Sequence, residues 1–167
     1  KKRHLIRQLL GRRGAKGMRA FSLSGRVCRP GVKIAPAGIT ARELVDEFGG
    51  GMQPGHTLLA YLPGGASGGI LPASLADLPL DFGRLESQGC FVGSGAVVVF
   101  SKQDDLKAVA RNLVRFFEHE SCGKCFPCRI GAQRLPTQTG QPINASAKIG
   151  RLDGDQNSHV RSYQDHR

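Results

Sequence analysis

Three cysteines spaced three residues apart, Cys122, Cys125 and Cys128, restrict this chain more than any other feature of its sequence. A Cys-x-x-Cys-x-x-Cys run places three thiols on one tight loop, and this is a spacing with which proteins hold iron–sulfur clusters. Gly123 lets the backbone turn between the cysteines, while Pro127 fixes a backbone angle beside the last of them. The spacing therefore favours an iron–sulfur site.

Two other interpretations stay open on spacing alone. A structural zinc site usually pairs two Cys-x-x-Cys arms, and this sequence has no second arm. The three thiols could also be unligated, although three neighbouring cysteines cannot all pair in disulfides. The positive charges of Lys124 and Arg129 favour thiolates and would offset an anionic cluster. Iron–sulfur ligation is thus preferred over zinc and over free thiols.

The residues around the cysteines, ESCGKCFPCRIG at 120–131, resemble the iron–sulfur motif of the NADH-binding flavoprotein subunits. These subunits occur in respiratory complex I, in NAD-reducing hydrogenases and in soluble NAD-dependent formate dehydrogenases. The resemblance implies that Cys122, Cys125 and Cys128 each bind one iron of a 4Fe–4S cluster that exchanges electrons with a nearby FMN. In the family a fourth cysteine follows downstream, but Cys128 is the last cysteine here. We therefore expect a labile, solvent-ligated cluster or an empty site.

Residues 18–73 predict a β-grasp unit, which is two strands, a helix and a third strand. Residues 20–27 alternate between apolar and polar side chains, and Pro30-Gly31 marks a turn into a return strand at 32–34. Thr40 and Glu43 have the spacing of a capping box, so we expect a helix that ends at the glycines 49–51. A further strand is expected at 58–62. The stretch SLSGRVCRPGVKIAPAGITARELVDEFGGGM also resembles the SLBB domain of the flavoprotein family.

Two glycine clusters, at 63–69 and 89–95, match neither the Rossmann nor the P-loop phosphate-binding pattern. We interpret them as turns that permit close backbone packing, with the second leading into a buried strand at 96–100. The stretch 62–100 matches the segment between the β-grasp unit and the cluster helices in the flavoprotein family. Its GGASGGILPA and GCF sequences resemble the soluble formate dehydrogenase β subunit more than complex I subunits.

A helix at 101–120 is expected to deliver the cysteines at its C-terminal end. Its apolar side chains recur at helical spacing and predict a stripe facing the core: Leu106, Val109, Ala110, Leu113, Val114 and Phe117. Asp104 and Asp105 would complement the helix dipole at its start. His119 is expected to be a surface residue, because the family motif does not use it.

The sequence thus predicts an α+β protein with five regions. These are a basic arm at 1–17, the β-grasp domain at 18–73, a glycine-rich connector with a strand at 74–103, the helical iron–sulfur region at 104–135 and a non-family tail at 136–167. Only seven of the 32 tail residues are apolar, so we expect the tail to be disordered. The large FMN- and NADH-binding domain of the family has no counterpart in this sequence.

Charge is concentrated at the beginning of the chain. The net charge is +11, and residues 1–19 hold eight Lys or Arg and no acidic residue. No aromatic platform accompanies this charge, so nucleic-acid binding is not expected. No apolar run is long enough to cross a bilayer, and an odd number of cysteines clustered at one place indicates a reducing compartment. We expect a cytoplasmic protein.

The function that the resemblance implies is electron transfer between FMN or NAD(H) and a 4Fe–4S cluster. The formate dehydrogenase β subunit is the first expectation, with a complex I or hydrogenase subunit as the alternative. The partners would be the other subunits of such an assembly. We expect no catalytic and no FMN- or NAD-binding residues within this chain, and no activity of the chain alone. A non-enzymatic β-grasp binding module with a zinc-binding cysteine loop is the rival class.

Overall fold

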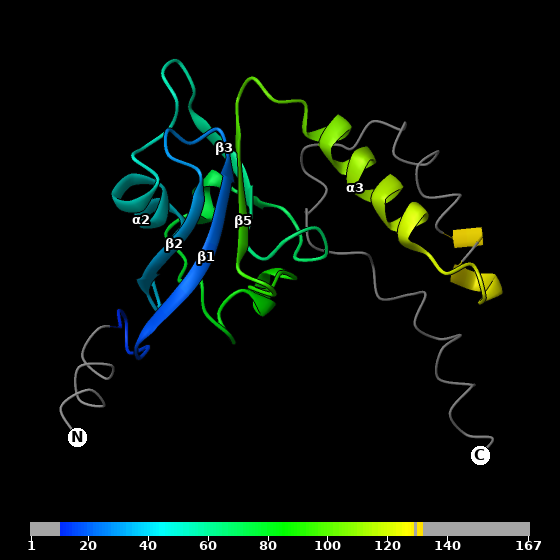
Figure 1. Cartoon of the computed structure of the whole chain (residues 1–167), viewed down its shortest axis with the longest axis horizontal. Coiled ribbons are helices and arrows are strands. Elements are labelled where there is room, and N and C mark those ends of the chain that lie inside the picture. The colour runs from blue at the N-terminus through cyan, green and yellow to red at the C-terminus, as the bar shows by residue number, and fades with distance from the viewer. Residues whose placement is uncertain (1–10, 129, 132–167) are drawn as a thin grey trace.

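A five-stranded mixed sheet forms the centre of the computed structural model, which describes residues 11–128 and 130–131. The strands are β1 (Met18–Gly25), β2 (Gly31–Pro36), β3 (Leu58–Leu62), β4 (Leu71–Pro72) and β5 (Ala96–Ser101). Their order is β2-β1-β5-β3-β4, and β5 runs parallel to β1 but antiparallel to β3 (Figure 1). A hairpin, a helix and a parallel central pair make a β-grasp arrangement, which confirms the predicted α+β class.

The first hairpin follows from its alternating sequence. Phe21 and Leu23 of β1 are buried, while Ser22 between them pairs with Val32 of β2 on the other face. The strand was predicted to continue to Val27, but it ends at Gly25. Gly25 has a positive φ of 90°, which takes the chain out of the extended conformation.

The helical segment between the strands begins at its predicted capping box. The Glu43 amide donates to Thr40 Oγ1 (3.2 Å), and the Thr40 amide donates to the Glu43 carboxylate (3.0 Å). Helix α2 (Ala41–Glu43) continues directly into a π-type turn, η1 (Leu44–Phe48). Leu44 and Val45 are buried beneath the sheet. This π-type turn differs from the helix expected here. It is closed by the Gly49 amide, which donates to the Leu44 carbonyl (2.9 Å).

Arg12 and Arg13 belong to the part of the basic arm that the structure describes, and both contact this helical segment. Arg12 forms a bidentate ion pair with Glu47, and Arg13 forms one with Glu43, all at 2.8 Å. The Arg13 hydrogen bond is the main cause that lowers the pKa of Glu43 to about 2. These two arginines therefore hold the start of the described chain on α2. The predicted arm from residue 1 to 10 lies outside the described residues.

The two glycine clusters pack against each other, as predicted for turns with close backbone contact. A Cβ atom on Gly64 would lie 2.2 Å from the Val92 carbonyl oxygen, and one on Gly93 would lie 2.6 Å from the Gly64 carbonyl oxygen. The Phe91 amide donates to the Gly68 carbonyl (3.3 Å). Two short 3-10 turns, η2 (Ala73–Leu75) and η3 (Glu86–Gln88), complete the layer beneath the sheet.

Helix α3 (Leu106–Glu120) corrects two predictions. It begins at Leu106 rather than at Ser101, because Ser101 is the buried last residue of β5 and Asp105 caps the helix by accepting from the Lys107 and Ala108 amides. The predicted core stripe is wrong, since α3 has no buried side chain and Phe117 is 43% exposed. Helical spacing indicates an apolar face but not what covers it.

Candidate iron–sulfur site

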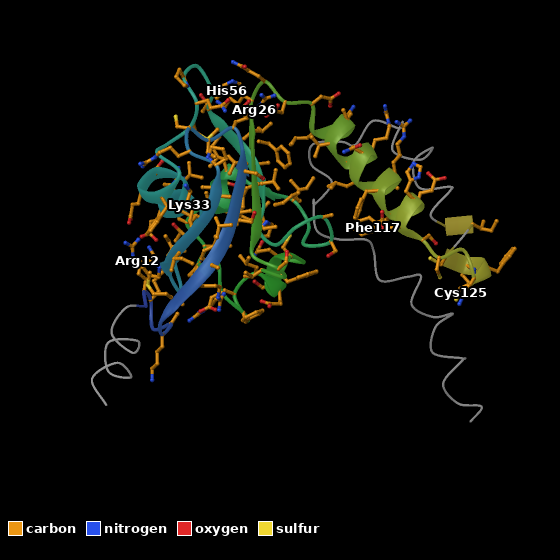
Figure 2. All side chains as sticks on the ribbon, viewed as in Figure 1. Arg12, Arg26, Lys33, His56, Phe117 and Cys125 are labelled. Carbon is orange, nitrogen blue, oxygen red and sulfur yellow. The ribbon has the colours of Figure 1, made fainter. Side chains whose placement is uncertain are left out.

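The cysteine loop stands at the end of α3 that is remote from the sheet. The helix ends at Ser121, whose extended backbone (φ −68°, ψ 128°) turns the chain away, and Cys122 follows at once. Figure 2 shows Cys125 at this far end of the molecule, while Arg26 and His56 lie at the sheet. The expected arrangement, a helix that carries the thiols at its C-terminal end, is what the structure has.

The loop itself is shaped by a glycine and a helical turn. Gly123 adopts a positive φ of 69°, the conformation for which a glycine was expected between the first two cysteines. Phe126, Pro127 and Cys128 then have helical backbone. All three thiols of the loop are exposed and free. They are accessible to an incoming metal and are available as ligands.

Ser121 is a polar neighbour of the thiols that the sequence analysis did not single out. Its hydroxyl oxygen lies 3.4 Å from Cys128 Sγ and 3.4 Å from the Gly123 amide, which donates to it. Its position in the sequence, directly before Cys122, could have indicated that it lies beside the thiols. The side chain links the two ends of the loop and supplies a hydroxyl beside the third sulfur.

An apolar groove of about 550 Å³ borders the same loop. It is lined by Val114, Phe117 and Glu120 of α3, and by Ser121, Pro127, Cys128 and Gly131 after the helix. The groove leaves Cys128 beside apolar carbon on one side and the serine hydroxyl on the other. Apolar and hydrogen-bonding neighbours of a sulfur ligand are a usual means of tuning a metal centre.

The three thiols share a loop but do not surround one point. Within the described part of the chain, no three His, Cys, Asp or Glu side chains are placed to hold a metal ion together. A tetrahedral zinc ion with bonds of about 2.3 Å would need its sulfurs about 4 Å apart. A 4Fe–4S cluster takes each thiolate on a different iron, so its ligands are spread more widely. Thiolates are the donor type with which proteins hold iron–sulfur clusters, and the loop offers three of them.

The remaining cysteines and the nearby histidine behave as structural or surface groups. Cys90 belongs to the hydrophobic core, and its burial raises the pKa of its thiol. Cys28 is exposed, and its thiol donates to the Met52 carbonyl (3.1 Å). His119 is exposed, as expected.

No helix among the described residues has both the length and the apolar character to cross a bilayer.

The family model for the iron–sulfur binding region of NADH-ubiquinone oxidoreductase-F matches residues 108–155, which include all three cysteines of the loop. The second NADH-quinone oxidoreductase F-subunit of Rhizobium meliloti is 42% identical over 115 residues, covering 69% of this chain and 27% of the relative. The NADP-reducing hydrogenase protein HndC of Solidesulfovibrio fructosivorans is 37% identical over 126 residues, covering 75% of this chain and 26% of the relative.

A solved structure of a related protein is similar to this chain in fold as well as in sequence. A chain of the NAD+-reducing [NiFe]-hydrogenase in its H2-reduced state is similar with a TM-score of 0.66 and 33% identity, over 79% of this chain and 22% of that one. The present chain therefore spans roughly a quarter of the length of these relatives. Sequence motif, fold and relatives agree that the chain corresponds to part of the family that includes the F-subunits of NADH-quinone oxidoreductases.

Proposed function

We propose that this chain is the iron–sulfur part of an NAD-linked oxidoreductase subunit, in which Cys122, Cys125 and Cys128 each hold one iron of a 4Fe–4S cluster. The observation that carries the proposal is the free, exposed cysteine loop on the end of α3, within the span that matches the iron–sulfur region. When bound, the cluster supplies one-electron transfer to and from FMN. The protein supplies position, a partly apolar surround and a hydroxyl beside one sulfur.

The chain's own residues define what the site does without the cofactor. Ser121 ends the helix so that Cys122 leaves it at once, and Gly123 reverses the chain toward Cys125. Val114, Phe117 and Pro127 place apolar carbon beside the exposed Cys128 thiol. Three cysteines leave the fourth iron without a cysteine ligand from residues 1–167. We therefore propose that the cluster is labile in the isolated chain, and that FMN and NAD bind in another domain.

The assembly to which the protein belongs is the finer part of the proposal. The GGASGGILPA and GCF sequences favour the β subunit of a soluble, cytoplasmic NAD-dependent formate dehydrogenase. The second candidate, a subunit of complex I or of an NAD-reducing hydrogenase, is favoured by the names of the relatives described above. The neighbouring genes separate these candidates: a molybdopterin formate dehydrogenase gene supports the first, and genes for a membrane proton pump or a hydrogenase support the second.

Anaerobic reconstitution with iron and sulfide tests the cysteine assignment. We expect the reduced 167-residue chain to become coloured and to release its iron readily to a chelator. Cys122→Ser, Cys125→Ser and Cys128→Ser should each lower the iron content, while Cys28→Ser, which removes an exposed thiol outside the loop, should not. Iron and zinc analysis with EPR identifies the metal. A zinc-loaded, colourless chain, or one that stays iron-free with the FMN domain supplied, would refute the proposal.

A further inference from the structure

The direction of α3 relative to the sheet is determined at one end of the helix. Figure 1 shows α3 leaving the end of β5 and extending away from the strands, and none of its side chains is buried. Its fifteen residues span about 22 Å, with the cysteine loop at the far end. Whatever fixes the first turn of α3 therefore also fixes where the cysteines lie.

Asp104, which precedes the helix cap, is held by the ends of both central strands. Its carboxylate accepts from the Ser101 amide (2.8 Å) and the Ser101 hydroxyl (3.2 Å) at the end of β5. It also accepts from Arg26 Nη2 (2.7 Å) and Nε (3.0 Å), directly after β1. The Arg26 amide is in turn bonded to the Val99 carbonyl (2.9 Å). The Asp104 side chain is only 13% exposed.

A second layer supports these contacts from the loop before β3. The buried Ser101 hydroxyl, which donates to Asp104, also lies within hydrogen-bond distance of His56 Nδ1, at 3.0 Å. The Lys102 amide donates to the Thr57 carbonyl at 3.0 Å. The linker between β5 and α3 is thus attached to three parts of the sheet. Figure 2 shows Arg26 and His56 close to the top of β5, where this linker begins.

We propose that Asp104 is a positioning residue for the cysteine loop, which sets the angle at which α3 leaves the β-grasp sheet. That the loop holds an iron–sulfur cluster rests on the function proposed above, but the role of Asp104 in orienting α3 does not. A tilt of about 10° at Asp104 moves the end of a helix of about 22 Å by about 4 Å. Because the protein's part in cofactor chemistry is to place the reacting groups, such a shift matters for electron exchange.

The Arg26 pair alone would not suggest this role, since exposed ion pairs contribute little to stability. The Arg26 side chain is 47% exposed, and the Arg42 side chain, which pairs with Asp77, is 48% exposed. The two pairs differ in what they join. The Arg42 pair joins α2 to the residues that follow η2 and does not involve α3, while the Arg26 pair joins a strand end to the start of α3. Arg42 therefore provides a matched control.

Residual dipolar couplings of the reduced, metal-free 167-residue chain measure the orientation of α3 directly. We expect the amides of α3 and of the sheet to fit one alignment tensor in the native chain. In Asp104→Ala and in Arg26→Gln, the tensor magnitude for α3 should fall at least about twofold while that of the sheet is retained. Arg42→Gln should leave both unchanged.

The proposal is overturned if α3 and the sheet already fit different tensors in the native chain, or if α3 keeps its tensor in Asp104→Ala. Should Asp104→Ala fail to fold, which the sheet resonances would reveal, Arg26→Gln decides in the same way. Because no metal is present, these outcomes are independent of iron binding. Conversely, loss of iron from the cysteine variants would leave the orientation of α3 as it is.

Discussion

Two glycines with the same backbone conformation but different surroundings test how tightly the central strands are packed. Gly25 and Gly51 have φ values of 90° and 81°, so alanine at either position is strained by about 1–2 kcal/mol. A Cβ on Gly51 would meet nothing within 4 Å, whereas one on Gly25 would lie 2.1 Å from the Val99 carbonyl oxygen. That atom belongs to a central strand and cannot rotate away.

Forcing the strands apart adds about 1–3 kcal/mol, the usual cost of overpacking a close contact. We expect Gly25→Ala to lower the free energy of unfolding by about 1–3 kcal/mol more than Gly51→Ala does. Urea denaturation of the reduced chain, followed by circular dichroism, measures both values, with equal m-values as the requirement for comparing them. If the two variants agree within about 0.5 kcal/mol, the close approach of Gly25 to β5 does not constrain the fold.

Two further predictions concern the capping box of α2 and the carboxyl groups of Glu43 and Asp104. Thr40→Ala should lower the free energy of unfolding by about 1 kcal/mol, and less when Glu43→Gln is already present, because both groups belong to one capping box; additive losses in urea denaturation would contradict this. The pKa values of Glu43 and Asp104 are both lowered to about 2, chiefly by hydrogen bonds from arginines. A carboxyl group with a depressed folded pKa stabilises the protein above its unfolded pKa of about 4, and this contribution is lost as the pH falls toward about 2. The urea midpoint should therefore fall across this range, and less steeply in Glu43→Gln; a midpoint independent of pH would show that these pairs do not contribute.

The local structure was largely predictable because short-range patterns determine it. Alternation specified the first hairpin, and the Thr40–Glu43 spacing specified the helix start, since each depends on residues close in sequence. The strand predicted at 58–62 has those bounds in the structure. The π-type geometry of η1 was not predictable, because five residues are too few for their apolar spacing to distinguish a π-type turn from an α-helical one.

Long-range placement was not predictable from these patterns. The parallel pairing of β1 with β5 joins residues as distant as Ser22 and Ala96, and no local signal specifies it. The predicted core stripe of α3 is wrong because apolar spacing reveals an amphipathic helix but not the partner that covers its apolar face. At the cysteine loop, the motif predicted the positions of the thiols and of Gly123. It did not predict the Ser121 contact or the role of Asp104, which depend on how the linker folds.

The central position of β5 has a consequence for the order in which the molecule can form. Strand β5 pairs with β1 on one side and with β3 on the other, yet among the strands of this sheet it is the last to leave the ribosome. Until then the earlier strands expose open edges that could pair with other chains, and closing the sheet requires slow, distant contacts. Because α3 and its thiols follow β5 directly, the nascent chain exposes the cysteine loop only after the residues that complete the sheet have been made.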